Sequence, residues 1–221
     1  MSRILPILLL LLVPVCHAQQ TGGGKLMVRF LAERAPKDLG EVVLATEKSK
    51  SAGFGLPVNH LSEPVEAPAR AFSVRTGEKD VALASVKLPE DGKSFIVLLV
   101  PNPKGGYKPV VIAANDPAFK PGDVYFYNHA DRPVLGYVGS AKFVLPPSSG
   151  KSLRPAGAKP EGYYDVGFGV REKEGDRALS TTRWPVDPQL RSYVFFFVNP
   201  TTKRLDFRAV DEFVPPVKPE S

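Results

Sequence analysis

The sequence predicts an all-β protein built as a β-sandwich, either two tandem Ig-like sandwiches or one larger sandwich, with long loops rich in proline and glycine. Three observations predict this fold. Short apolar stretches alternate with turn signals along the chain, which is the pattern of many short strands. No stretch of a dozen residues shows a helical period. The 23 prolines are scattered rather than periodic, as expected where turns separate strands.

The strands of the first half follow from the spacing of apolar residues. Residues 25–33 alternate between apolar and polar, which indicates a strand with one buried face, and residues 41–46 form a second short apolar stretch. Residues 47–68 show no period and are predicted to be a long irregular connection, which is either functional or poorly ordered. The remaining predicted strands of this half are 69–75, 80–88, 95–100 and 107–113.

Residues 95–100 are apolar on both faces, which predicts a central strand covered on each side. The predicted strands of the second half are 123–129, 133–138, 142–145, 152–154, 163–170, 178–184, 193–198 and 204–210. In the strand 163–170 the large apolar residues share one face, and Gly167 and Gly169 lie on the other, where a neighbouring group can pack closely.

Two passages of the sequence resemble each other. SFIVLLVPNP begins at Ser94 and SYVFFFVNP begins at Ser192, and their turns place Asn102 and Asn199 at 97 positions apart. One interpretation is a duplication, with halves 25–116 and 117–213 that are each the size of a seven-strand sandwich. The other is convergence, because few residues suit a central hairpin. Under either interpretation both passages are core strands and not sites.

The N-terminus predicts export from a bacterial cell. One arginine, an apolar run over Ile4–Val15 and a small residue form a signal-peptide pattern over residues 1–18, with cleavage after Ala18. The run is too short to span a bilayer, so no transmembrane span is expected in the mature chain. The rival interpretation is a lipoprotein anchored at Cys16, against which Val15 argues, since a small residue normally precedes that cysteine. The protein is therefore expected in the periplasm or outside the cell.

Composition excludes several function classes. Residues 19–24 are predicted to be a flexible lead-in and 214–221 a disordered tail. Cys16 is the only cysteine, so the mature chain has neither a disulfide nor a thiolate metal site. The formal net charge is +6, but lysine and arginine are dispersed among acidic residues, and this pattern does not predict binding to nucleic acid.

No catalytic motif is present in the sequence. His60 and His129 are the only histidines after the signal, and HxH, HExxH and GxSxG spacings are absent. His129 is expected to have a role in a turn. We therefore expect no metal, no cofactor and no enzymatic activity. The alternative is a secreted hydrolase with a carboxylate site near Asp165, which stands inside an apolar strand.

Binding is the function that the sequence favours. The single tryptophan, Trp184, stands where a strand gives way to a loop, and Tyr163, Tyr125 and Tyr127 add aromatic surface. Such rings suit both sugar stacking and protein interfaces, although a lone tryptophan in a sandwich is also a common core residue. The prediction is a non-enzymatic protein of the bacterial envelope or extracellular space that binds a protein or polysaccharide partner.

Overall fold

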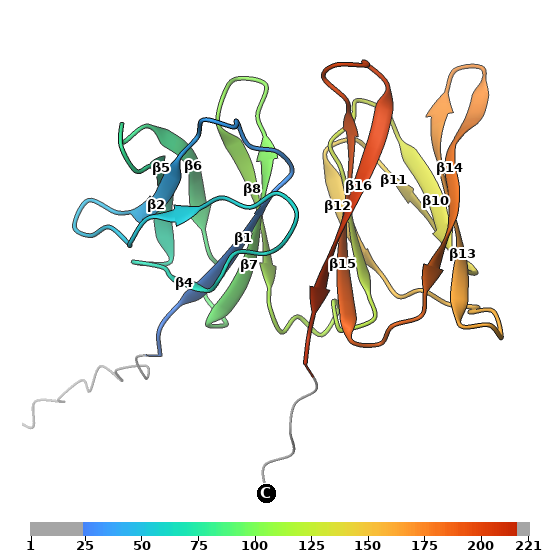
Figure 1. The fold of residues 1–221 in the computed structure, drawn as a ribbon, viewed down its shortest axis with the longest axis horizontal. Helices are drawn as coiled ribbons and strands as arrows, with labels where there is room; N and C mark the ends of the chain where they lie inside the picture. The colour runs from blue at the N-terminus through green and yellow to red at the C-terminus, as the bar shows by residue number, and fades with distance from the viewer. Residues whose placement is uncertain (1–23, 216–221) are drawn as a thin grey trace, which may run out of the picture.

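The computed structural model describes residues 24–215 and is all-β (Figure 1). The predicted signal peptide 1–18, Cys16 and the last residues of the predicted tail, 216–221, lie outside the described residues. Within residues 24–215 there is no helix, so none that could cross a membrane. The all-β sandwich-type fold is thus confirmed.

Sixteen strands form four sheets of four strands each, which we name A to D. Sheet A consists of β4 (Val65–Glu66), β1 (Met27–Ala32), β7 (Ser94–Pro101) and β8 (Tyr107–Ala113). Sheet B consists of β3 (Phe54–Gly55), β2 (Glu41–Ala45), β5 (Ala71–Thr76) and β6 (Ala82–Lys87). Sheet C consists of β12 (Ser149–Leu153), β9 (Val124–Asn128), β15 (Leu190–Val198) and β16 (Leu205–Phe213). Sheet D consists of β11 (Ala141–Leu145), β10 (Val134–Val138), β13 (Tyr163–Glu172) and β14 (Gly175–Pro185).

The four sheets stack in the order B, A, C, D (Figure 1). Sheets B and A enclose the core of a first sandwich, and sheets C and D enclose the core of a second. A third apolar core lies where sheet A faces sheet C. The two sandwiches are therefore joined by buried apolar surface, which makes the contact between them part of the folded core.

The two sandwiches repeat one topology. Every strand in the order of sheet A has its counterpart eight strands later in sheet C, and sheets B and D correspond in the same way. In each sandwich the first and seventh strands pair in parallel, with Ser94 opposite Met27 and Ser192 opposite Val124. Strand order and the parallel pairing of the first and seventh strands thus both repeat, which is the arrangement that the duplication interpretation expects.

The prediction that strand 95–100 is covered on both faces is confirmed, and the stack of sheets explains it. Alternate side chains of a strand point to opposite faces of its sheet. In β7, Phe95, Val97 and Leu99 belong to the core of the first sandwich. Ile96, Leu98 and Val100 belong to the core between the sandwiches. A strand in an isolated sandwich exposes one of its faces to solvent. In this protein the second sandwich packs on that face of β7 and buries it.

Two further expectations from the sequence concern the connection 47–68 and the packing beside Gly167. The connection 47–68, expected to be irregular, contributes β3 and β4, and its Leu61 is buried in the core between the sandwiches. The close packing predicted beside Gly167 is present, because a Cβ atom on that residue would overlap the ring of Tyr137 in the neighbouring strand β10. The group that packs there is thus part of the protein itself.

Charged side chains are buried where the sandwiches meet. The carboxylate of Glu212 accepts hydrogen bonds from Arg29 Nη1 at 2.7 Å, Arg191 Nε at 3.0 Å and Tyr193 Oη at 2.7 Å. Arg29 belongs to the first sandwich and the other three to the second. His129 lies in the connection between β9 and β10, as expected of a turn residue, and its Nδ1 is 2.5 Å from Oε2 of the buried Glu33 in the first sandwich. These contacts fix how the sandwiches sit against each other.

Tyr125 is partly buried against the core between the sandwiches, and this burial makes the stability of the protein sensitive to alkaline pH. Desolvation by burial, with the nearby Tyr127, raises the pKa of Tyr125 to about 12. The folded state therefore holds a proton that the unfolded state loses from about pH 10 upward. The contribution of the protonated tyrosine to the free energy of unfolding is therefore fully present below about pH 10 and is lost as the pH rises to about 12. Tyr125 accounts for about 2–3 kcal/mol of this decrease in the free energy of unfolding.

Urea unfolding at a series of pH values measures this effect, with Tyr125→Phe as the comparison. Burial also raises the pKa of Tyr107 and Tyr193, so the variant should keep their share of the pH dependence and lose only that of Tyr125. Identical pH dependence in the two proteins would show that the Tyr125 hydroxyl is not desolvated.

Candidate functional site

A cavity of about 190 Å³ lies at one end of the second sandwich, between sheets C and D. It is formed where β9, β13 and β15 begin and where β10, β14 and β16 end. Its apolar lining consists of Val124, Val138, Tyr164, Trp184 and Leu190 among other side chains. Val124 and Val138 are buried members of the core, so they close the cavity towards the centre of the sandwich.

Trp184 and Tyr164 form the aromatic part of the cavity wall. They stand opposite each other on the paired strands β14 and β13, and both are half-buried. The Trp184 ring meets the buried ring of Phe168 at 5.7 Å between centroids and 61° between planes, an edge-on contact. Packing against Phe168 holds the indole in place while another part of it remains available to the cavity.

An ion pair lies beside these rings. Arg154 Nε lies 2.5 Å from Oδ1 of the buried Asp123, whose Oδ2 accepts a hydrogen bond from the Lys120 amide at 2.7 Å. Gly122 has a φ of +88°, and a Cβ atom there would lie 2.7 Å from Arg154 Nη1. The positive φ favours glycine at this position, and any larger residue would also displace the guanidinium of Arg154.

Two exposed carboxylates complete the polar lining. Asp211 Oδ1 accepts a hydrogen bond from Ser192 Oγ at 2.6 Å, and Asp187 Oδ1 accepts one from the Gln189 amide at 2.8 Å. Within residues 24–215 the second oxygen of each carboxylate receives no hydrogen bond from the protein. With Asp123 and Arg154, the lining holds three carboxylates and one guanidinium, so its formal charge is negative.

At the corresponding end of the first sandwich, apolar side chains are buried. Trp184 stands near the end of β14, and the strand that corresponds to β14 in the first sandwich is β6. Leu88 comes directly after β6 and is buried with 1% exposure. Ala67 and the partly buried Leu26 pack in the same core. At the side of the sandwich β6 lies against β8, whereas the described strands β14 and β16 do not come together in this way. The two repeats thus differ at this end, where the second sandwich has a half-buried tryptophan and the first has buried apolar residues.

The structure does not bring the four predicted aromatic residues together. Trp184 lines the cavity. Tyr163 lies on the outer face of sheet D, where Arg183 stacks over its ring at 4.7 Å. Tyr127 is buried in the core between the sandwiches with 3% exposure, and Tyr125 is partly buried against the same core. Both tyrosines pack against residues of sheet A. The order of apolar and polar residues within one strand does not reveal that another sheet packs on that strand.

Sequence reasoning missed most of the cavity lining. Tyr164 was placed on the apolar face of its strand, as the structure has it, but not in a site. Asp123, Arg154, Asp187 and Asp211 come from four separate segments, each next to a turn or at a strand end. The one sequence feature that these four residues share is a position near the start or the end of a strand. In an antiparallel sheet the end of one strand lies beside the start of its neighbour, so such residues can meet.

Asp165, the candidate for a hydrolase site, lies on the outer face of sheet D. Its carboxylate is 3.3 Å from Lys159 Nζ and 3.8 Å from Arg183 Nε, and its side chain is 45% exposed. Glycoside hydrolysis needs a second carboxyl group across the scissile bond. The described charged groups in contact with Asp165 are cations, and this arrangement suits a surface ion-pair cluster.

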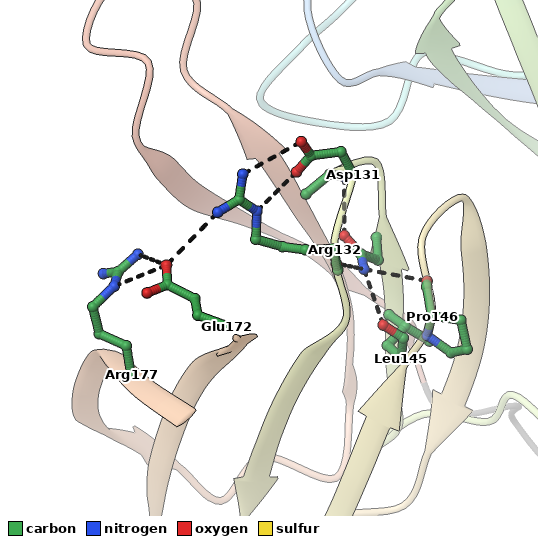
Figure 2. Close-up of polar contacts among 8 residues, drawn as sticks. Asp131, Arg132, Leu145, Pro146, Glu172 and Arg177 are labelled. Atoms are coloured by element: carbon green, nitrogen blue, oxygen red, sulfur yellow. Dashed lines mark hydrogen bonds and ion pairs between the residues drawn. The ribbon is translucent and has the colours of Figure 1, made fainter. Parts of the chain in front are cut away.

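A second cluster of charges lies at the opposite end of sheet D (Figure 2). Arg132 Nε is 2.8 Å from Asp131 Oδ1, and Arg132 also reaches Glu172, which Arg177 Nη2 contacts at 2.9 Å. Hydrogen bonds from Arg132 and Arg177 hold the pKa of Asp131 and of Glu172, respectively, below the usual range. Each carboxylate is thus already paired, and the cluster ties the β13–β14 hairpin to the loop before β10.

The two histidines and the acidic residues do not form a metal site in the part of the chain that the structure describes. No group of three or more His, Cys, Asp or Glu side chains in residues 24–215 is placed to hold an ion. His60 is exposed and its Nδ1 lies 2.8 Å from Asn59 Oδ1. The cavity beside Trp184 therefore remains the candidate site. No protein-family model matches the chain, and no curated protein matches it in sequence.

Proposed function

We propose that this chain is an exported, non-enzymatic protein of the bacterial envelope or extracellular space that binds a protein or polysaccharide partner through the cavity beside Trp184. The observation that carries the proposal is this cavity in the second sandwich, which the half-buried Trp184 lines together with polar side chains. A partly exposed tryptophan beside convergent polar groups is the usual composition of a ligand site. Core packing alone does not require either feature.

The side chains of the cavity support binding more than catalysis. Asp123 is neutralised by Arg154, and one oxygen of Asp187 and of Asp211 is held by a neighbouring donor. Among the described residues that line the cavity there is no histidine. These groups can accept and donate hydrogen bonds to a ligand while the aromatic rings contact its apolar surface. Hydrolysis would need in addition an acid and a base on opposite sides of a scissile bond.

Trp184→Ala is expected to weaken binding on the order of 30-fold, because truncation of an anchoring tryptophan commonly removes 2 kcal/mol or more. The measurement is co-sedimentation of the purified protein with insoluble cell-wall polysaccharide, together with affinity capture of envelope proteins, at low and high salt. Tyr163→Ala is the matched control, since it removes an aromatic ring from the outer face of the same sheet and leaves the cavity unchanged.

Binding that resists salt, persists in Tyr163→Ala and is lost in a folded Trp184→Ala protein supports the proposal. Binding that disappears in salt for all three proteins indicates only nonspecific attraction of a basic protein to anionic polymers. Equal salt-resistant binding by the wild type and Trp184→Ala would contradict a role for the cavity.

Export is tested separately from binding. The chain recovered from a bacterial envelope or culture fluid is expected to begin at Gln19, which N-terminal sequencing would show. A chain that begins at a lipid-modified Cys16 would instead identify a lipoprotein. A full-length chain retained in the cytoplasm would contradict export.

A further inference from the structure

The size of the cavity limits what can enter it. Sites for drug-sized ligands commonly measure about 300–1,000 Å³, whereas this cavity measures about 190 Å³. The buried side chains of Val124 and Val138 close it towards the core. A single ring or a single side chain fits such a space, and the interior of a long chain does not. The occupant is therefore either a single side chain or the terminal ring of a longer chain.

The lining is amphipathic, and this narrows the chemistry of the occupant. Trp184 and Tyr164 present π-systems with negative faces, against which the C–H bonds of a sugar ring can pack. Asp187 and Asp211 each keep one carboxylate oxygen free to accept a hydroxyl hydrogen, and Arg154 can donate. An aliphatic side chain of a partner protein would cover the same rings but leave the carboxylates desolvated without a hydrogen bond, which is costly.

The charge of the cavity lining indicates that the ligand carries no acidic group. The lining holds Asp123, Asp187 and Asp211 against the single guanidinium of Arg154. A uronate or a phosphorylated sugar would bring a further negative charge towards free carboxylate oxygens. The chain as a whole has a formal net charge of +6, so its general surface attracts the same anionic polymers that the cavity repels.

We propose that the cavity accepts the terminal ring of a polysaccharide chain and that this ring carries no acidic group. The inference rests on the proposed function, because it names the ligand class of the same cavity. The aromatic rings bind one face of the sugar, and Asp187, Asp211 and Arg154 bind its hydroxyl groups.

Tryptophan fluorescence provides a direct test, because Trp184 is the only tryptophan in the chain. The full protein is titrated with neutral malto-, cello- and chito-oligosaccharides and with oligogalacturonates of equal length, at physiological salt. At least one neutral series is expected to change the emission of Trp184 with saturation. Oligogalacturonate is expected to bind at least about 10-fold more weakly, as expected for one additional unfavourable charge interaction.

Two matched comparisons test the remaining parts of the inference. A cyclic glucan and its linear counterpart share composition but differ in chain ends, so only the linear form should bind where a maltosaccharide is the ligand. For a cello- or chito-oligosaccharide, affinity per chain should stay constant as the chain lengthens. The variant Asp187→Asn/Asp211→Asn keeps side-chain shape and removes two charges, and it should narrow the preference for neutral over acidic sugars to less than about 3-fold.

The outcomes separate this inference from the proposed function. If no oligosaccharide changes Trp184 emission while an envelope protein binds in a Trp184-dependent way, the sugar inference is wrong and the binding function stands. If neither binds, both are wrong. Equal affinity for oligogalacturonate overturns the charge argument. Equal binding of cyclic and linear glucans, or affinity that grows in proportion to chain length, overturns the chain-end argument.

Discussion

Replacing Glu212 by leucine is expected to lower the free energy of unfolding by about 3–5 kcal/mol, the cost of breaking a buried ion pair by removing one partner. The side chains of Glu212 and Arg191 are each 6% exposed, and Arg191 Nη2 lies 2.9 Å from the carboxylate. Without Glu212 the guanidinium stays buried with no counter-charge. Arg29 and the Tyr193 hydroxyl also lose the acceptor to which both donate.

Urea unfolding at neutral pH measures this loss, and two comparisons assign its cause. Glu66→Gln removes a carboxylate from the exposed pair with Lys25 and is expected to leave the unfolding midpoint unchanged. Adding Arg191→Met to Glu212→Leu removes the uncompensated charge and should recover part of the stability. If the double variant is no more stable than Glu212→Leu, the loss comes from packing and not from the unpaired guanidinium.

Phe196→Ala is expected to cost about 3–5 kcal/mol of stability, as is typical of a large-to-small substitution in a core. The Phe196 ring is fully buried in the core of the second sandwich. Its centroid lies 5.0 Å from that of Phe168, 6.1 Å from that of Phe126 and 6.2 Å from that of Phe207. Removal leaves a cavity among these rings, and Phe168 in turn supports Trp184.

Phe195→Ala is the matched comparison, because its side chain is equally buried but points into the core between the sandwiches. Both variants should be destabilised in urea unfolding. The emission of Trp184 in the folded protein should shift in Phe196→Ala and stay as in the wild type in Phe195→Ala. An identical shift in the two variants would mean that the cores on the two sides of sheet C do not respond independently.

The strands and their buried faces followed from the sequence, because both depend on local chemistry. A strand presents alternate side chains to opposite faces, so the period of apolar residues reveals which face is buried. That rule identified the apolar face of 163–170 and the two-sided burial of 95–100, and the structure confirms both. Glycine and proline marked the turns for equally local reasons.

The tertiary structure alone decided which surface covers which face. The sequence showed that both faces of 95–100 are apolar but not that a second sandwich covers one of them. Tyr125 and Tyr127 illustrate the consequence, since they have the composition of a binding surface and lie between sheets A and C. His129 was expected in a turn and contacts Glu33, 96 positions away in the chain.

The candidate site and the buried charges depended most on tertiary structure. Of the residues that line the cavity, Trp184 alone was expected in a site, and Asp123, Arg154 and Asp211 come from other segments of the chain. Arg29 reads as a solvent-facing residue of the alternating strand 25–33, and Glu212 follows the last predicted strand, 204–210, yet these two residues, 183 positions apart, form an ion pair. A charged side chain is stable in the interior only when a partner of opposite charge meets it there. Local sequence therefore determined the strands, and long-range packing determined which polar groups came together.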